Sequence, residues 1–267
     1  MNKNNIFKNF NAKTEINNII RWIKKFKEYN NIEGFVLGLS GGIDSTVVLE
    51  LLRKAVGEKN IFVLIMPCNS NINDKEDALN IIKEYKNKNI NIEYEIINLD
   101  EIYFNFITKQ NQNTFKDNKI IKGNIKARLR MTQLYLTAQS KNSIVVGTGN
   151  LSELKIGYFT KYGDGGVDIE PIGNYYKTEI YKIAKELNIS DKIINKKPSA
   201  GLWEYQNDED ELGMSYEKID IILYGIRYLK KHILDSFDIN EVEKVHNLIR
   251  KSSHKNGTPL RCPRQDI

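Results

Sequence analysis

A turn rich in glycine and serine, residues 38–45, joins an apolar run to a segment with helical periodicity. Gly41 and Gly42 let the backbone approach a ligand closely, and the serine hydroxyls and the N–H groups of a helix start can donate hydrogen bonds to a phosphate. Asp44 would repel a bare phosphate, so it suits a site where a cation such as Mg²⁺ lies between the two. The turn therefore predicts a site for a metal–nucleotide complex. The alternative is a simple glycine–serine turn in which Asp44 caps the helix.

A second glycine-containing turn, residues 147–150, follows the apolar run 143–147. In an open α/β sheet, ligands bind beyond the carboxyl ends of the strands, near the point where the strand order reverses. Because both turns follow predicted strands, we expect them to border one cleft.

Apolar runs and helical patterns alternate along the chain, which is typical of a parallel sheet covered by helices on both faces. We therefore predict a single domain over residues 1–267, with an α/β, Rossmann-like, doubly wound fold. The predicted strands are 35–39, 61–66, 92–99 and 143–147. The predicted helices are 14–28 with Thr14 as its cap, 44–56, 74–86, 102–110, 122–140, 176–187, 216–234 and 240–251, with a short helix or turn at 190–194.

Three stretches lack this periodicity. Residues 110–118 are polar and predict a loop, and the glycine-rich stretch 158–174 predicts a functional loop. Residues 198–214 are acidic and contain Gly201 and Gly213. We interpret this last stretch as a candidate mobile lid.

Composition narrows the class of protein. The formal charge of +6 permits a nucleic-acid partner, but lysines are interleaved with acidic residues throughout, which indicates a solvated surface. No apolar run approaches the roughly 20 residues of a membrane-spanning helix, and the N-terminus does not resemble a signal peptide. The two cysteines, Cys68 and Cys262, form no metal-binding or disulfide pattern. We expect a cytoplasmic protein that binds neither membrane nor nucleic acid.

The turn at 38–45 lacks the lysine of a Walker A loop and the pattern of a dinucleotide-binding loop. It resembles the Ser-Gly-Gly-x-Asp-Ser loop of enzymes that split ATP between its α and β phosphates, the adenine nucleotide alpha hydrolase-like group. Three further segments, 126–131, 147–153 and 159–168, are similar to ammonia-dependent NAD synthetases in order and spacing. This resemblance covers nearly the whole chain. It implies ATP-dependent amidation of deamido-NAD to NAD with ammonia, the last step of NAD biosynthesis, through an adenylated nicotinate intermediate and with release of AMP and pyrophosphate.

The resemblance also assigns roles to residues. It implies that Asp44 and Glu153 bind Mg²⁺ and that, with Lys177, they are the catalytic groups. It places ATP at Gly38, Leu39, Ser40, Gly41, Gly42, Ile43, Asp44, Ser45, Thr148, Lys177 and Ser199, the last of which stands where threonine is usual. It places deamido-NAD at Arg128, Lys161, Asp168, His254 and Lys255. Members of the family are homodimers with substrate sites near the subunit interface, so we expect a homodimer.

Taken alone, several of these residues have an ordinary structural interpretation. Arg128 and Lys161 could be surface cations, Asp168 a turn residue, His254 a solvated side chain near the tail, and Glu153 a cap within its own helix. Only the surrounding motifs favour a functional role.

The nitrogen source is open at the level of the second turn, because its Gly-Thr-Gly-Asn-x-Ser-Glu form also occurs in glutamine-dependent relatives. Those relatives carry an additional amidohydrolase domain, which we do not expect within these 267 residues, and we expect neither cysteine to act as a nucleophile. A tRNA-thiolating enzyme would suit the positive charge but would show a cysteine pair, and a regulatory nucleotide-binding module would have less need of both Asp44 and Glu153.

Overall fold

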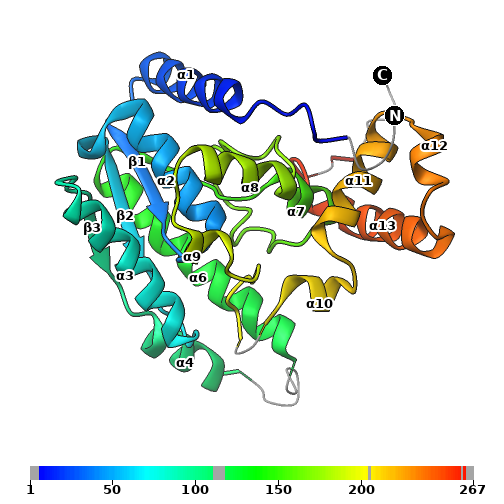
Figure 1. Cartoon of the computed structure of the whole chain (residues 1–267). Helices are drawn as coiled ribbons and strands as arrows, with labels where there is room; N and C mark the ends of the chain where they lie inside the picture. Colours follow the sequence, from blue (N-terminus) through cyan, green and yellow to red (C-terminus); the bar gives the residue numbers. More distant parts are fainter. Residues whose placement is uncertain (1–5, 111–117, 204–205, 260, 263–267) are drawn as a thin grey trace.

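The structure, a computed structural model, describes residues 6–110, 118–203, 206–259 and 261–262. Its centre is a four-stranded parallel sheet with strand order β3-β2-β1-β4, shown in Figure 1. The strands are β1 (Gly34–Gly38), β2 (Ile61–Ile65), β3 (Glu93–Ile96) and β4 (Ser143–Val146). An isolated parallel bridge between Val146 and Ile169 extends the pairing beyond β4. The predicted parallel α/β sheet is confirmed.

Helices cover both faces of the sheet. The helices of this layered part are α1 (Ala12–Asn30), α2 (Ile43–Val56), α3 (Ile72–Asn87), α4 (Asp100–Thr108), α6 (Lys119–Ser140) and α8 (Lys177–Glu186). On one face, Phe35, Leu37 and Val63 pack into a core with α1, α2, α3 and α8. On the other face, Val36 and Leu64 pack against α4 and α6. The middle strands are buried on both sides, which explains their uninterrupted apolar sequences.

A second apolar core lies beside the sheet, among helices from the C-terminal part of the chain (Figure 1). It is formed by α7 (Leu151–Ile156), α11 (Tyr216–Arg227), α12 (Lys231–Leu234) and α13 (Ile239–Ser252). The remaining short helices are η2 (Glu58–Asn60), α9 (Asp191–Ile194), α10 (Asp208–Leu212) and η3 (Ser253–Lys255). Because α7 and α8 contact both this core and the sheet helices, the two parts meet at the start of α8.

Two local predictions are wrong. The first helix begins at Ala12, and its cap is Asn11, whose side chain accepts a hydrogen bond of 3.0 Å from the Thr14 N–H; Thr14 therefore lies inside the helix. The helix predicted over 216–234 is two helices, because Leu229 adopts a left-handed conformation and the chain turns there. Gly225 permits this turn, since a Cβ atom at that position would lie 2.7 Å from the Leu234 side chain.

Most of the predicted loop 110–118 lies outside the described residues. No helix in the part of the chain that the structure describes is both long and apolar enough to cross a membrane.

Candidate active site

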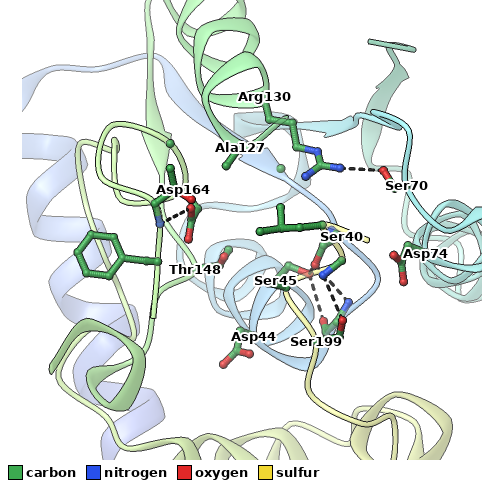
Figure 2. A pocket seen from close by; sticks show the side chains of 18 of the residues that line it. Ser40, Asp44, Ser45, Ser70, Asp74, Ala127, Arg130, Thr148, Asp164 and Ser199 are labelled. Atoms are coloured by element: carbon green, nitrogen blue, oxygen red, sulfur yellow. Dashed lines mark hydrogen bonds between the residues drawn. The ribbon is translucent and has the colours of Figure 1, made fainter. Parts of the chain in front are cut away.

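A cavity of about 640 Å³ opens at the carboxyl ends of the strands. This size is in the range of small-molecule binding sites. Gly38, Ser40 and Asp44 from the first glycine turn line it together with Gly147 and Thr148 from the second, as Figure 2 shows in part. The prediction that both turns border one cleft is confirmed.

The first turn is held in a conformation that presents its polar groups to the cavity. Gly41 has a φ angle of 78°, and a Cβ atom there would lie 2.8 Å from the side chain of Asp77 on α3, so only glycine fits. The Ser40 and Ser45 hydroxyl oxygens lie 3.1 Å apart. The Ser45 hydroxyl also contacts the Gly42 carbonyl at 3.1 Å. The turn leads into the N-terminus of α2, so hydroxyl groups and the positive end of a helix dipole meet at the same edge of the cavity.

Three charged side chains from three helices converge beside this turn. Lys177, the first residue of α8, is buried and forms ion pairs with Asp44 and with Glu153, the latter at 3.5 Å. Asp44 also accepts a hydrogen bond of 3.1 Å from the side chain of Asn150. Burial alone would lower the pKa of Lys177, but the Asp44 and Glu153 carboxylates raise it above its ordinary value. The Lys177 ammonium group thus forms ion pairs with both carboxylates.

The same arrangement raises the pKa of Glu153. Burial is the largest cause, and the charge of Asp44 acts in the same direction against the opposing effect of Lys177. The Lys177 ammonium group therefore does not fully offset the cost of burying the Glu153 carboxylate.

This donor set fits Mg²⁺. Within the described ranges, no group of three or more His, Cys, Asp or Glu side chains could hold a metal ion. Asp44 and Glu153 would therefore bind a cation only together with oxygens from a ligand. Mg²⁺ is usually held by one or two carboxylates plus substrate phosphates, and the Lys177 ammonium already lies between the two carboxylates as a positively charged group.

Glu153 also helps to cap α7, the helix in which it lies. Asn150 and Glu153 form a capping box at the start of α7, in which the Asn150 side chain accepts the Glu153 N–H at 3.0 Å. One Glu153 carboxylate oxygen caps the helix at 3.3 Å, and the other faces Lys177. Asn150 lies in the second glycine turn but is not among the site residues predicted from the sequence.

Most of the other residues assigned to ATP lie at the cavity wall. Leu39, Gly42, Ile43, Thr148 and Ser199 all line the cavity, whereas Gly41 lies behind the turn against α3. The Ser199 hydroxyl oxygen accepts a hydrogen bond of 3.1 Å from the Gly201 N–H.

The residues assigned to deamido-NAD are only partly brought together. Lys255 lines the cavity and donates hydrogen bonds of 2.7 Å to the carbonyls of Gly157 and Phe159. Outside the cavity, the Arg128 guanidinium donates to the Lys161 carbonyl at 3.3 Å, and the Lys161 ammonium donates to the His254 carbonyl.

Asp168 stands apart from this chain of contacts. Its carboxylate accepts hydrogen bonds from the Val145 N–H at 2.7 Å and from the Tyr135 hydroxyl at 3.0 Å. Asp168 thus lies beside β4, and both of its carboxylate oxygens already accept hydrogen bonds.

Arg130 is a cavity residue that the sequence analysis did not select. Its guanidinium donates to the Met66 carbonyl at 3.1 Å and to the Ser70 hydroxyl at 2.8 Å, as Figure 2 shows for Ser70. Arg128 and Arg130 belong to the same motif, but residues two apart on a helix face nearly opposite directions. The motif alone therefore does not indicate which of the two arginines lines the cavity.

Glu170 supports the second glycine turn from behind. A Cβ atom at Gly149 would lie 2.7 Å from its carboxylate, and one Glu170 oxygen is buried without a hydrogen-bond partner among the described residues. Burial, followed by the charge of Asp164, raises the pKa of Glu170 from 4.5 to about 8. The folded protein therefore favours the protonated side chain.

This predicts a pH dependence of stability. A carboxyl group with a raised pKa in the folded state contributes most below pH 4.5, and the contribution is lost as pH rises through about 8. Glu170→Gln, which resembles the protonated acid, is expected to raise the free energy of unfolding at pH 9 by roughly 1–3 kcal/mol and to change it little at pH 5. Urea unfolding at both pH values measures this. The exposed Glu33→Gln serves as control, and an equal response of both variants would contradict the account.

The chain is similar to known proteins over nearly its whole length. A family model described as NAD synthase matches residues 15–259. An NH(3)-dependent NAD(+) synthetase of Carboxydothermus hydrogenoformans is 44% identical over 252 residues, which cover 94% of this chain and 97% of that protein.

Two solved structures are similar to this chain over nearly its whole length. The NMN synthetase from Francisella tularensis has a TM-score of 0.83 and 36% identity, with 95% of this chain and 99% of that chain covered. The NH3-dependent NAD synthetase from Campylobacter jejuni has a TM-score of 0.80 and 33% identity, with 95% and 100% covered.

Proposed function

The chain belongs to the NAD synthase family, and on this basis we propose that it uses ATP and ammonia to convert deamido-NAD to NAD, the last step of NAD biosynthesis. The observation that carries the proposal is the convergence of Asp44, Glu153 and Lys177 beside the turn at 38–45, inside a cavity of suitable size. The site combines donors for phosphate with carboxylates for a cation.

The chemistry requires activation of a carboxylate, because its oxygen is a poor leaving group. We propose that an oxygen of the nicotinate carboxylate attacks the α-phosphorus of ATP, so that the bond to the β-phosphate breaks and pyrophosphate leaves. Ammonia then attacks the acyl carbon of the adenylate, loses a proton and expels AMP. Lys177 and the hydroxyl and N–H groups of the turn would bind the phosphates and stabilise their charge.

Asp44 and Glu153 would hold Mg²⁺, which supplies positive charge to the phosphate oxygens. No step needs a covalent nucleophile from the protein. This agrees with the position of the cysteines, since Cys68 is buried and neither Cys68 nor Cys262 lines the cavity.

A second candidate substrate follows from the comparison with the Francisella tularensis NMN synthetase. The same chemistry applied to nicotinate mononucleotide would yield the amidated mononucleotide. The ratio of kcat/KM for deamido-NAD and for nicotinate mononucleotide decides between the two substrates.

The overall test is an assay of purified protein with ATP, Mg²⁺ and deamido-NAD, to which either ammonium or glutamine is added. We expect NAD, AMP and pyrophosphate with ammonium and no NAD with glutamine alone. Absence of AMP and pyrophosphate with both carboxylate substrates would contradict the proposed function.

A homodimer is supported by exposed apolar side chains on two helices that pack together, α4 and α6. They are Ile102, Phe104, Phe106, Ile120, Ile121 and Leu136. Exposed apolar side chains on adjacent helices are common at interfaces, and a second copy of the chain would shield them from water. Sedimentation equilibrium should give twice the chain mass of 30.9 kDa, and a single chain mass at micromolar concentration would contradict the proposal.

We also propose that the segment 198–214 acts as a lid. Ser199, Gly201 and Leu202 line the cavity, and the buried Lys126 donates hydrogen bonds of 2.7 Å to the carbonyls of Leu202 and Asn69. Lys126 thus joins the lid to the loop after β2.

This predicts that Lys126→Met loosens the lid. The loss of two hydrogen bonds from a charged donor should increase the rate of proteolytic cleavage within 198–214 roughly tenfold. ATP should slow cleavage in the unmodified protein. Limited proteolysis with mass spectrometry measures both effects, and the exposed Lys119→Met on the same helix is the control. Equal cleavage rates in the two variants would contradict the role of Lys126.

A further inference from the structure

A buried carboxylate outside the cavity contacts α7 and α8. These helices contain Glu153 and Lys177, which with Asp44 form the charged site. Asp220 on α11 is 0% exposed. One of its oxygens accepts a hydrogen bond from the Ser152 hydroxyl on α7, and the other accepts the Thr178 N–H on α8 at 2.8 Å. The Ser152 oxygen in turn accepts the Lys177 N–H at 2.9 Å. Asp220 and Ser152 thus bind the first two N–H groups of α8.

The start of α8 is bonded by side chains from two other helices. The helices α1, α6, α7 and α13 are capped by a side chain of the preceding residue. At α8 the preceding residue is Tyr176, which contributes no side-chain cap to the N–H groups. Within the helix, the Glu179 carboxylate accepts the Tyr176 N–H at 2.9 Å. The helix also receives a carboxylate from another helix, at the end where negative charge is stabilised by the dipole. A buried carboxylate is costly unless its oxygens are bonded, and here both oxygens are bonded.

The location of the network connects it to the charged site. Ser152 directly precedes Glu153, and the Lys177 N–H belongs to the residue whose ammonium lies 3.5 Å from Glu153. Asp220 therefore holds the neighbour of each residue in the pair, the Ser152 side chain next to Glu153 and the Thr178 N–H next to Lys177. The Lys177 N–H itself is held by Ser152. A shift of α8 relative to α7 would change the distance between Lys177 and Glu153 directly.

We propose that Asp220 is a positioning residue that, through Ser152 and the start of α8, sets the separation of Glu153 and Lys177 for binding of the ATP phosphates. The inference rests on the proposed function for the identity of the ligand. It does not require turnover, because ATP binding alone reports on the geometry.

The test compares Asp220→Asn and Ser152→Ala with Glu50→Gln. Glu50 is also a buried carboxylate, but it is bonded to Arg53 and Tyr85, and none of these three residues lines the cavity. Unfolding measures the stability of each variant, and calorimetry with ATP and Mg²⁺ measures the dissociation constant without the second substrate. Hydrogen exchange at the start of α8 shows whether the Lys177 and Thr178 amides have lost protection.

We expect ATP affinity to fall roughly tenfold in Asp220→Asn and in Ser152→Ala, with faster exchange at the start of α8 and a lower kcat. The double variant should lose little more affinity than either single variant, because both act through one network. Glu50→Gln should lose stability but keep its ATP affinity within about twofold.

The inference would be overturned if Asp220→Asn and Glu50→Gln, at similar stability, bound ATP with equal affinity. If Asp220→Asn fails to fold, Ser152→Ala decides by the same comparison. Failure of the proposed function is distinguishable, since it would show as absent NAD formation in the unmodified protein.

Discussion

Asp44→Asn is expected to reduce kcat/KM for NAD formation roughly 10³-fold, the scale of losing a main electrostatic contact in the transition state. The asparagine has nearly the same shape but removes the negative charge that pairs with Lys177 and would bind Mg²⁺. The site then has one carboxylate, Glu153, to hold both positive charges. Steady-state rates at saturating and at limiting Mg²⁺ measure the effect, and excess Mg²⁺ should restore only part of the activity.

The control is Asp238→Asn. Asp238 caps α13 far from the cavity lining, and asparagine is an equally good cap. Its activity should equal that of the unmodified protein. Activity of Asp44→Asn within about threefold of this control would show that Asp44 has no part in the electrostatic stabilisation that the proposed mechanism requires.

Lys177→Met is expected to lose activity by roughly 10²–10³-fold and also to lose stability. The ammonium is buried between Asp44 and Glu153, and its removal leaves two close carboxylates without a cation. Breaking a buried ion pair from one side costs about 3–5 kcal/mol. Because the two carboxylates are then free, Mg²⁺ should raise the melting temperature of the variant more than that of the unmodified protein.

Thermal unfolding with and without Mg²⁺ measures this second prediction. Lys185→Met, at an exposed position of the same helix, is the matched control and should change neither activity nor the response to Mg²⁺. An unchanged response to Mg²⁺ in Lys177→Met would contradict the assignment of the two carboxylates as the cation site.

Much of the fold could be predicted because its signals are local. The two middle strands, β1 and β2, are nearly uninterrupted apolar runs, and the first glycine turn lies where β1 ends and α2 begins. The carboxyl ends of parallel strands share one edge of the sheet, so the meeting of the two turns also followed. Helix ends were less predictable. Both Asn11 and Thr14 are residue types that cap helices, and the structure uses Asn11. The end of α11 near Leu229 depends on the close packing of Gly225 against Leu234, which is a tertiary contact.

The details of the site depend on contacts between distant parts of the chain. Nothing near Lys177 in the sequence indicates that its ammonium lies between Asp44 and Glu153, or that Asp220 holds the start of its helix. The buried state of Glu170 likewise depends on the two glycines of the second turn, which admit its carboxyl group. The roles of Lys177, Asp220 and Glu170 follow only from the three-dimensional arrangement of the helices and turns.

The most direct test of the account uses deamido-NAD labelled with ¹⁸O in its nicotinate carboxylate, incubated with the protein, ATP, Mg²⁺ and ammonium. If the carboxylate attacks the α-phosphorus beside Asp44, Glu153 and Lys177, NAD forms with one labelled oxygen in each AMP and none in pyrophosphate. NAD formation with label in inorganic phosphate and ADP as product, or with unlabelled AMP, would contradict the adenylation mechanism.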